Sequence, residues 1–151
     1  MLLKVAAGGA ALALAGCGGS STSETTSALP PGCSVAEVDG IVTSFLASPA
    51  LAPSPLFRAY ATSESDGRRF STRRRAVALA ELRALHTAGE RDRLLSLRVA
   101  AEDVNHVRIT FRLTRFSPGF RARGIYTRVA QGAGTVDCAH GKIAAWVSKG
   151  P

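Results

Sequence analysis

The sequence predicts a small α+β domain, and a change of periodicity along the chain is the main observation behind this. In two segments, 34–48 and 71–88, apolar side chains recur at the three- and four-residue spacing of amphipathic helices. From Arg93 onward they alternate with polar side chains, as in a sheet with one buried face. Helices followed by a run of antiparallel strands is an α+β order. With 151 residues, the chain has room for one such domain.

The first helix is predicted to begin at a capping box, Ser34-Val35-Ala36-Glu37. In this motif the Ser34 hydroxyl accepts from a backbone amide, and Glu37 reaches back to the amide of Ser34. One apolar stripe follows, made of Val35, Val38, Ile41, Val42, Phe45 and Leu46. Pro49 ends the helix, and residues 56–63 are predicted to form a short strand after an irregular Pro-rich stretch.

A second helix is predicted after a turn at Asp66-Gly67, capped by Ser71 or Thr72 and running to about Ala88. Gly89 supplies the stop signal. Its buried face is expected to consist of Val77, Ala80 and Leu85, flanked by Leu79 and Leu82.

The rest of the domain is predicted to be sheet. The clearest strand has Val107, Ile109, Phe111 and Leu113 on one face and His106, Arg108, Thr110, Arg112 and Thr114 on the other. We expect the apolar face to point inward, because a one-residue slip would bury arginines without partners. Residues 117–119 are expected to turn the chain. A long strand over 124–138, interrupted near Gly132-Ala133-Gly134, and a last strand over 142–148 complete a sheet of about five strands.

The N-terminus has the organisation of a bacterial export signal. A short positive start at residues 1–4 precedes an apolar run over 5–14, which is shorter than the roughly 20 residues that span a bilayer. Leu14-Ala15-Gly16-Cys17 then matches the lipobox of bacterial lipoproteins. The resemblance implies cleavage before Cys17, acylation of its thiol, and an extracytoplasmic location anchored to the cell membrane. A plain secretory signal that contains a cysteine is the alternative, and the short start also leaves an upstream start codon open.

We therefore divide the chain into a signal peptide (1–16), a lipidated tether (17–32) and a folded domain (33–151). The tether is rich in Gly, Ser, Thr and Pro and is expected to be disordered. With Cys17 lipidated, Cys33 and Cys138 are the two remaining cysteines. Outside the cytoplasm such a pair most simply forms a disulfide, and two free buried thiols are the alternative.

The chain is strongly basic, with 19 Lys and Arg against 11 Asp and Glu. Such a surface suits nucleic acid, anionic lipid headgroups or acidic polymers, and the extracytoplasmic address argues against nucleic acid. A genome that favours arginine codons is the competing explanation. His106, Arg108 and Arg112 form a basic strip that we expect to be an ordinary solvated face. A surface that binds an anion or a partner is the more specific alternative.

The order of elements resembles the NTF2-like superfamily, also called SnoaL-like or cystatin-like in fold. The segments that carry the resemblance are Ser34-Val35-Ala36-Glu37-Val38, Val107 through Arg115, and Gly134-Thr135-Val136-Asp137-Cys138 before a strand with Trp146. It covers about residues 33–150 and looks like actinobacterial lipoproteins of this superfamily. It implies a cone in which a curved antiparallel sheet wraps two helices around a pocket. The Pro-rich stretch over 48–55 departs from the short second helix that usually helps to close the cone.

Five aromatic side chains are candidates to line a ligand pocket in that cone, with a purely structural core role as the alternative: Phe57, Tyr60, Phe111, Tyr126 and Trp146. We assign no catalytic residue, because a tyrosine with a pKa near 10 is a poor general base at neutral pH. The three histidines are dispersed, so no metal site is expected. The sequence has no phosphate-binding or dinucleotide motif, and no cofactor is expected.

Three classes of function remain. The favoured one is non-catalytic binding of a small apolar or amphipathic ligand in the cone. A structural or interaction lipoprotein with a filled cone comes next, and an isomerase, dehydratase or hydrolase last, so whether the chain is an enzyme stays open. The partners under consideration are the membrane through the lipid anchor, a small apolar ligand, and a second copy of the chain through the sheet face.

The lipobox makes a direct prediction about Cys17. Mass spectrometry of the native protein should find a mature chain that begins at Cys17 and carries acyl groups, since two acyl chains hold a protein stably on a membrane. A mature chain that begins elsewhere with an unmodified terminus would refute the prediction.

Overall fold

The computed structural model describes residues 28–49, 53–65 and 68–150. The signal peptide, Cys17 and most of the expected tether lie outside this range. A single six-stranded sheet has the order β2-β1-β6-β5-β4-β3, so the predicted α+β class is confirmed. The strands are β1 (Ala59–Ser65), β2 (Arg68–Thr72), β3 (Arg91–Ala101), β4 (His106–Phe116), β5 (Arg128–Asp137) and β6 (Lys142–Lys149). The helices are α1 (Val35–Ala47), α2 (Arg75–Thr87) and α3 (Pro118–Ala122).

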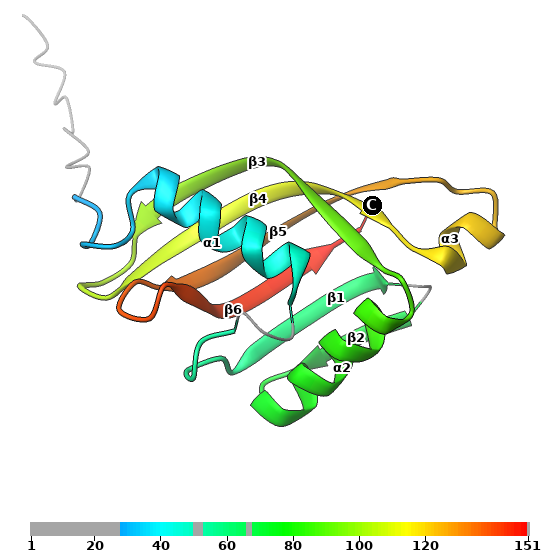
Figure 1. The fold of residues 1–151 in the computed structure, drawn as a ribbon, viewed down its shortest axis with the longest axis horizontal. Coiled ribbons are helices and arrows are strands. Elements are labelled where there is room, and N and C mark those ends of the chain that lie inside the picture. The colour runs from blue at the N-terminus through cyan, green and yellow to red at the C-terminus, as the bar shows by residue number, and fades with distance from the viewer. Residues whose placement is uncertain (1–27, 50–52, 66–67, 151) are drawn as a thin grey trace, which may run out of the picture.

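The two long helices lie on the same side of the curved sheet (Figure 1). Helix α1 crosses β3 to β6, α2 lies beside β1 and β2, and the short α3 follows β4 at one end. Neighbouring strands are antiparallel except for β1 and β6, which pair in parallel. Within the described residues, none of these helices is long and apolar enough to cross a bilayer.

Helix α1 forms as its sequence predicts. The Ser34 hydroxyl accepts from the Glu37 amide at 3.3 Å, and the Glu37 carboxylate accepts from the Ser34 amide at 2.9 Å, which makes the capping box complete. The helix buries Val38, Val42, Phe45 and Leu46 against the sheet. Local chemistry and one apolar stripe are therefore sufficient to place this element.

The sheet has one strand more than the five expected, because β1 and β2 form an antiparallel pair with Tyr60 opposite Thr72. Ser71 and Thr72 therefore belong to a strand, and the prediction that one of them caps the second helix is wrong. The N-cap of α2 is Arg74, whose amide donates to the Thr72 hydroxyl at 3.0 Å.

The buried face of α2 is rotated about the helix axis relative to the predicted one. Ala78, Leu82 and Leu85 are buried, whereas Val77 is 42% exposed and Ala80 is exposed. Alanine and leucine occur on several sides of this helix, so its periodicity alone does not select one face. Contact with β1 and β2 selects it.

Strand β4 has the predicted two faces. Val107, Ile109, Phe111 and Leu113 are buried on the helix side, and Arg108, Thr110 and Arg112 are exposed. The pattern continues one step further than the sequence analysis took it, because Arg115 is also on the inner face and only 2% exposed.

The glycines of β5 do not interrupt the strand, which is continuous from Arg128 to Asp137. Gly132 lies opposite Phe111 and Gly134 opposite Ile109, where the absence of a side chain leaves room for the neighbouring large one. The expected strand start near Gly124 and the turn at 117–119 are also wrong. Pro118 instead begins helix α3, as proline readily does at a first helical position, and β5 starts at Arg128.

Cys33 and Cys138 form the predicted disulfide, with their Cα atoms 5.5 Å apart and 105 positions separating them in the chain. Both residues belong to the hydrophobic core. The bond joins the start of α1 to the end of β5. Just before it, Leu29 packs against the core and Pro30 is buried.

Loss of this disulfide should destabilise the domain considerably, because it closes a long loop. Removing a bond that closes a loop of this length is expected to lower the free energy of unfolding by about 2–5 kcal/mol. Urea unfolding of Cys33→Ser tests this, with Cys17→Ser as the control that leaves the bond intact. Equal unfolding midpoints for the two variants would contradict the expectation.

Two glycine-to-alanine substitutions should have opposite effects. A Cβ at Gly132 would collide with the Val147 carbonyl oxygen and lie 2.6 Å from the Phe111 ring, so Gly132→Ala should cost about 1–3 kcal/mol. A Cβ at Gly40, within α1, would meet nothing within 4 Å, so Gly40→Ala should add about 0.5–1 kcal/mol. Urea unfolding measures both effects. A stabilising Gly132→Ala would show that β5 has room for a side chain between β4 and β6 at this position.

Candidate functional site

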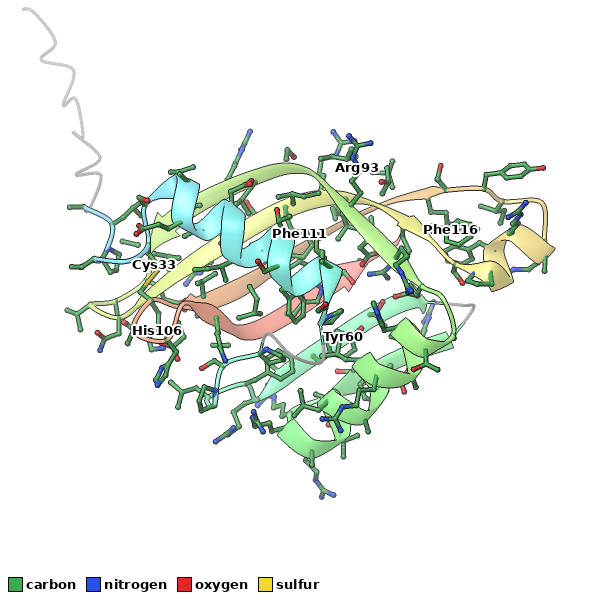
Figure 2. All side chains as sticks on the ribbon, viewed as in Figure 1. Cys33, Tyr60, Arg93, His106, Phe111 and Phe116 are labelled. Carbon is green, nitrogen blue, oxygen red and sulfur yellow. A yellow bond between two sulfur atoms is a disulfide. The ribbon has the colours of Figure 1, made fainter. Side chains whose placement is uncertain are left out.

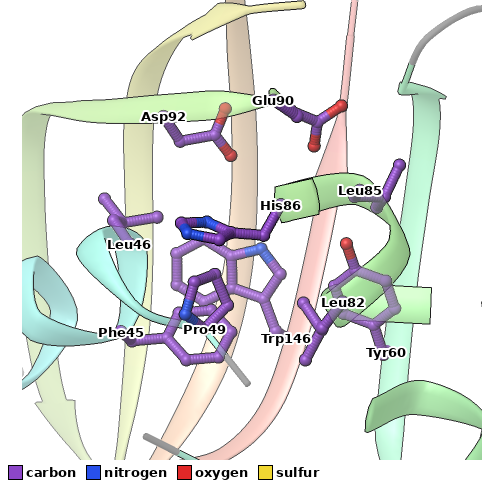
Figure 3. Close-up of a pocket in the computed structure, with 10 residues that line it drawn as sticks. All are labelled: Phe45, Leu46, Pro49, Tyr60, Leu82, Leu85, His86, Glu90, Asp92 and Trp146. Carbon is purple, nitrogen blue, oxygen red and sulfur yellow. The ribbon is translucent and has the colours of Figure 1, made fainter. Parts of the chain in front are cut away.

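A small cavity lies where α1 and α2 meet the inner face of the sheet. Phe45, Leu46 and Pro49 contribute from α1 and the residues after it, and β1 and β6 contribute Tyr60 and Trp146. Leu82, Leu85 and His86 from α2, Glu90, and Asp92 from β3 complete the lining. Its volume is about 30 Å³, enough for about two water molecules. Figure 3 shows Glu90 and Asp92 at one end of this cavity, away from the aromatic rings.

Aromatic rings fill most of the interior next to the cavity. Trp146 stacks on Phe111 with ring centroids 3.9 Å apart and contacts Phe45 at 4.9 Å. Tyr60 contacts Phe70 at 5.7 Å on the α2 side. In Figure 2 the labelled Phe111 lies behind α1, and Tyr60 lies nearer α2. The interior is therefore largely packed at this level of the sheet.

A buried guanidinium lies at the polar end of the cavity. Arg115 donates from Nε and Nη2 to the two oxygens of Asp92 at 2.9 and 2.8 Å, a bidentate ion pair. Its Nη1 donates to the Thr62 hydroxyl at 2.6 Å, and Nη2 also donates to the Ser148 hydroxyl at 3.0 Å. A carboxylate oxygen of Glu90 lies 3.6 Å from Nε. We call Arg115, Asp92, Glu90, Thr62 and Ser148 the Arg115 network.

The strand register explains how the Arg115 network assembles. Arg115 pairs with Asp92 across β4 and β3, and Thr62 pairs with Ser148 across β1 and β6. These positions all face the same side of the sheet as the core, at one end of it. A buried cation is costly unless it is paired and hydrogen-bonded, and the network supplies both.

The electrostatics of this region hold Arg115 and the neighbouring Tyr60 each in one protonation state. Burial acts to lower the pKa of Arg115, but its hydrogen bonds and ion pairing with Asp92, together with Glu90, raise the pKa above its ordinary value. Burial, and then the negative charge of Glu90, raise the pKa of Tyr60 far above its ordinary value. At neutral pH Arg115 is therefore a cation and Tyr60 a neutral phenol that can donate a proton in a hydrogen bond but cannot act as a base.

The structure separates the five predicted pocket residues. Tyr60 and Trp146 line the cavity, Phe111 stacks behind Trp146, and Phe57 is fully buried in the core. Tyr126 is 71% exposed, so its expected place inside the cone is wrong. It lies in the loop between α3 and β5, where the sequence predicts the start of a strand.

The residues that the sequence analysis missed are those of the Arg115 network. One signal could have found Arg115: it occupies the next inward position after Val107, Ile109, Phe111 and Leu113. An arginine in that series requires an acidic partner, and no local pattern says which of the acidic residues supplies it. The pairing of β3 with β4 decides that the partner is Asp92.

A second buried carboxylate, Asp137, lies beside the disulfide, and its hydrogen bonds all go to nearby groups of the protein. It accepts from the Ser54 hydroxyl at 2.5 Å, from the His140 amide at 3.2 Å, and contacts the His140 ring at 2.7 Å. Burial acts to raise the pKa of Asp137, and these hydrogen bonds outweigh it and lower the pKa. A catalytic triad needs the imidazole between the hydroxyl and the carboxylate. Here the carboxylate is in the middle, so His140 cannot activate Ser54.

The histidines do not assemble into a metal site. His106 pairs with Asp103 at 2.9 Å, and His140 pairs with Asp137. In the described part of the chain, no three His, Cys, Asp or Glu side chains are placed to hold a metal ion.

No protein-family model and no curated protein matches this chain, but solved structures do. A protein of unknown function with a cystatin-like fold from Methylobium petroleophilum PM1 is 17% identical, with 80% of this chain and 79% of that one covered and a TM-score of 0.52. A protein from Catenulispora acidiphila in complex with S-DNPA is 14% identical, over 76% and 91% of the two chains, with a TM-score of 0.47. A candidate polyketide cyclase from Xanthomonas campestris pv. campestris is 16% identical, over 76% and 90%, with a TM-score of 0.41. The first of these likenesses confirms the cystatin-like, NTF2-like fold and nothing beyond the fold.

The Arg115 network should be sensitive to loss of its cation. Arg115→Met removes the cation that donates two hydrogen bonds to the half-buried Asp92 carboxylate and is expected to lower the free energy of unfolding by about 3–5 kcal/mol. Arg112→Met is the matched control, because Arg112 is on the same strand with its side chain exposed, and should change stability by less than about 0.5 kcal/mol.

Urea unfolding of both variants makes the comparison. Adding Asp92→Asn to Arg115→Met should restore part of the lost stability, because it removes an unpaired charge. Similar losses for the two single methionine variants would contradict a special role for Arg115.

Proposed function

We propose that this protein is an extracytoplasmic lipoprotein, anchored through an acylated Cys17, whose cystatin-like domain is a non-catalytic interaction module. The lipobox Leu14-Ala15-Gly16-Cys17 supports the anchor, and the packed interior supports the non-catalytic role. The interior of the domain serves stability, and its outer surface meets the partner. This is the filled-cone alternative of the sequence analysis, and it now ranks above binding of an apolar ligand inside the cone.

The packing of the interior is the observation that carries this proposal. Sites for small organic ligands usually have volumes of about 300–1,000 Å³. The cavity under α1 and α2 has about 30 Å³, because Phe45, Phe111 and Trp146 occupy the space between helix and sheet. An apolar ligand at this level would need one of these rings to move.

Two polar side chains at this end of the interior, Tyr60 and Arg115, also support a non-catalytic role. All three nitrogens of Arg115 already donate to Asp92, Thr62 or Ser148. Tyr60 stays protonated at neutral pH because burial and the charge of Glu90 raise its pKa. General acid–base catalysis needs a group with a pKa near the working pH and within reach of a substrate atom. Tyr60 and Arg115 do not meet the first condition.

A thermal-shift and turnover screen with hydrophobic ketones, epoxides and lipids tests the proposal. The native protein should show no shift in Tm and no turnover. A ligand present at about one hundred times its Kd would stabilise the domain by about 2.7 kcal/mol, which such a screen detects readily.

Two results would overturn the proposal. A reproducible rise in Tm that Trp146→Phe abolishes would show that the interior opens to a ligand. Turnover that Tyr60→Phe abolishes would show that the domain is an enzyme.

A further inference from the structure

The face of the sheet turned away from α1 and α2 carries a concentration of positive charge. Figure 1 shows both long helices on the opposite face. Alternation along the strands directs five cationic side chains to the uncovered face, which we call the basic sheet face: Arg93 and Arg98 from β3, Arg108 and Arg112 from β4, and Lys149 from β6. All five residues are exposed.

Acidic residues are almost absent from this face in the part of the chain that the structure describes. Glu90 and Asp92 face the interior. Asp137 is only 1% exposed, and its carboxylate is bound by Ser54 and His140. Glu37 and Asp39 lie on α1, Glu81 lies on α2, and Asp103 pairs with His106 in the β3–β4 turn. Glu102 is the acidic side chain that reaches the basic sheet face, 3.6 Å from Arg108 at its edge. Most of the described acidic side chains therefore lie away from the basic sheet face, and the field outside this face is positive.

The basic sheet face is broad and shallow. A groove across β3 to β6 is bordered by Ser96, Arg98, Thr110, Arg112, Gln131 and Lys149. Arg112, Gln131 and Lys149 lie in one row across three strands, and Arg98 pairs with Thr110 in the next row. The floor between them consists of small residues such as Ala133 and Val147.

We propose that the basic sheet face docks on a bilayer that contains anionic lipids. Dispersed cations over a shallow surface complement a plane of anionic headgroups, and each Lys or Arg near such a surface contributes about a fivefold gain in binding. Phe111 borders the groove, but its ring points inward onto Trp146, so it offers no stacking platform for single-stranded nucleic acid. A symmetric dimer through this face would bring like charges together.

The position of the folded domain permits this docking. From Cys17 to Ala28 there are 11 residue steps, which span at most about 40 Å when fully extended. That reach is enough for the sheet to lie against the membrane that holds the anchor. This step rests on the proposed lipid anchor, whereas the charge of the basic sheet face does not.

The experiment uses the chain from residue 17 onward with Cys17→Ser, so that neither an acyl group nor the apolar run over 5–14 contributes. Co-sedimentation measures its partition onto vesicles of phosphatidylcholine alone and of equal parts phosphatidylcholine and phosphatidylglycerol. The chain should bind the anionic vesicles more tightly, and added salt should weaken that binding. Arg98→Gln with Arg112→Gln should lower the partition onto anionic vesicles by about 25-fold.

Arg73→Gln with Arg83→Gln is the matched control. It removes the same charge from exposed positions on the helix side, one before α2 and one within it, and should change the partition much less. Equal binding to the two kinds of vesicle, or equal loss in the two double variants, would overturn the proposal. So would tight binding of inorganic polyphosphate without vesicle binding, or a dimer that the Arg98 and Arg112 substitutions dissociate. Because the chain here is unlipidated, these outcomes are independent of whether Cys17 is acylated.

Discussion

The covering of the sheet on one face alone is the constraint on which the rest of this structure depends. Helices α1 and α2 supply apolar surface to only one side, so every central strand must separate its side chains by polarity. Strand β4 does this from Val107 to Leu113, with buried Val107 and Ile109 alternating with exposed Arg108 and Arg112. The inner face becomes a packed core, and the outer face carries charge.

Arg115 is the exception to this separation, because it is a charged side chain on the inner face. The side chain is inward and almost completely buried, so its charge needs carboxylate partners and its remaining donors need acceptors. Asp92 and Glu90 supply the charge, and Thr62 and Ser148 supply hydroxyl oxygens. The network joins β1, β3, β4 and β6 at one end of the sheet. Because the donors of Arg115 are already used within the network, this arrangement is better suited to stabilising the fold than to acting on a substrate.

The same separation gives the molecule two surfaces of different character. The helix side carries the acidic residues of α1 together with the arginines in and before α2, whereas the basic sheet face is almost uniformly positive. The disulfide and the capping box fix the start of the domain, where the chain arrives from the N-terminal segment. A domain that is closed inside and charged outside fits an interaction at a surface better than the enclosure of a ligand.

The sequence by itself determined the features that depend on a few neighbouring residues or on counting. The capping box placed α1, and strict alternation placed β4 and its two faces. The two cysteines that remain once Cys17 is assigned to the lipid anchor indicated the bond between Cys33 and Cys138. Only the tertiary structure decided the pairing of β2 with β1, the buried side of α2, the exposure of Tyr126 and the partners of Arg115. The physical reason is that periodicity and capping act over one or two turns of chain. Arg115 and Asp92 are separated by 23 positions, and Thr62 and Ser148 by 86, so only strand pairing brings each pair together.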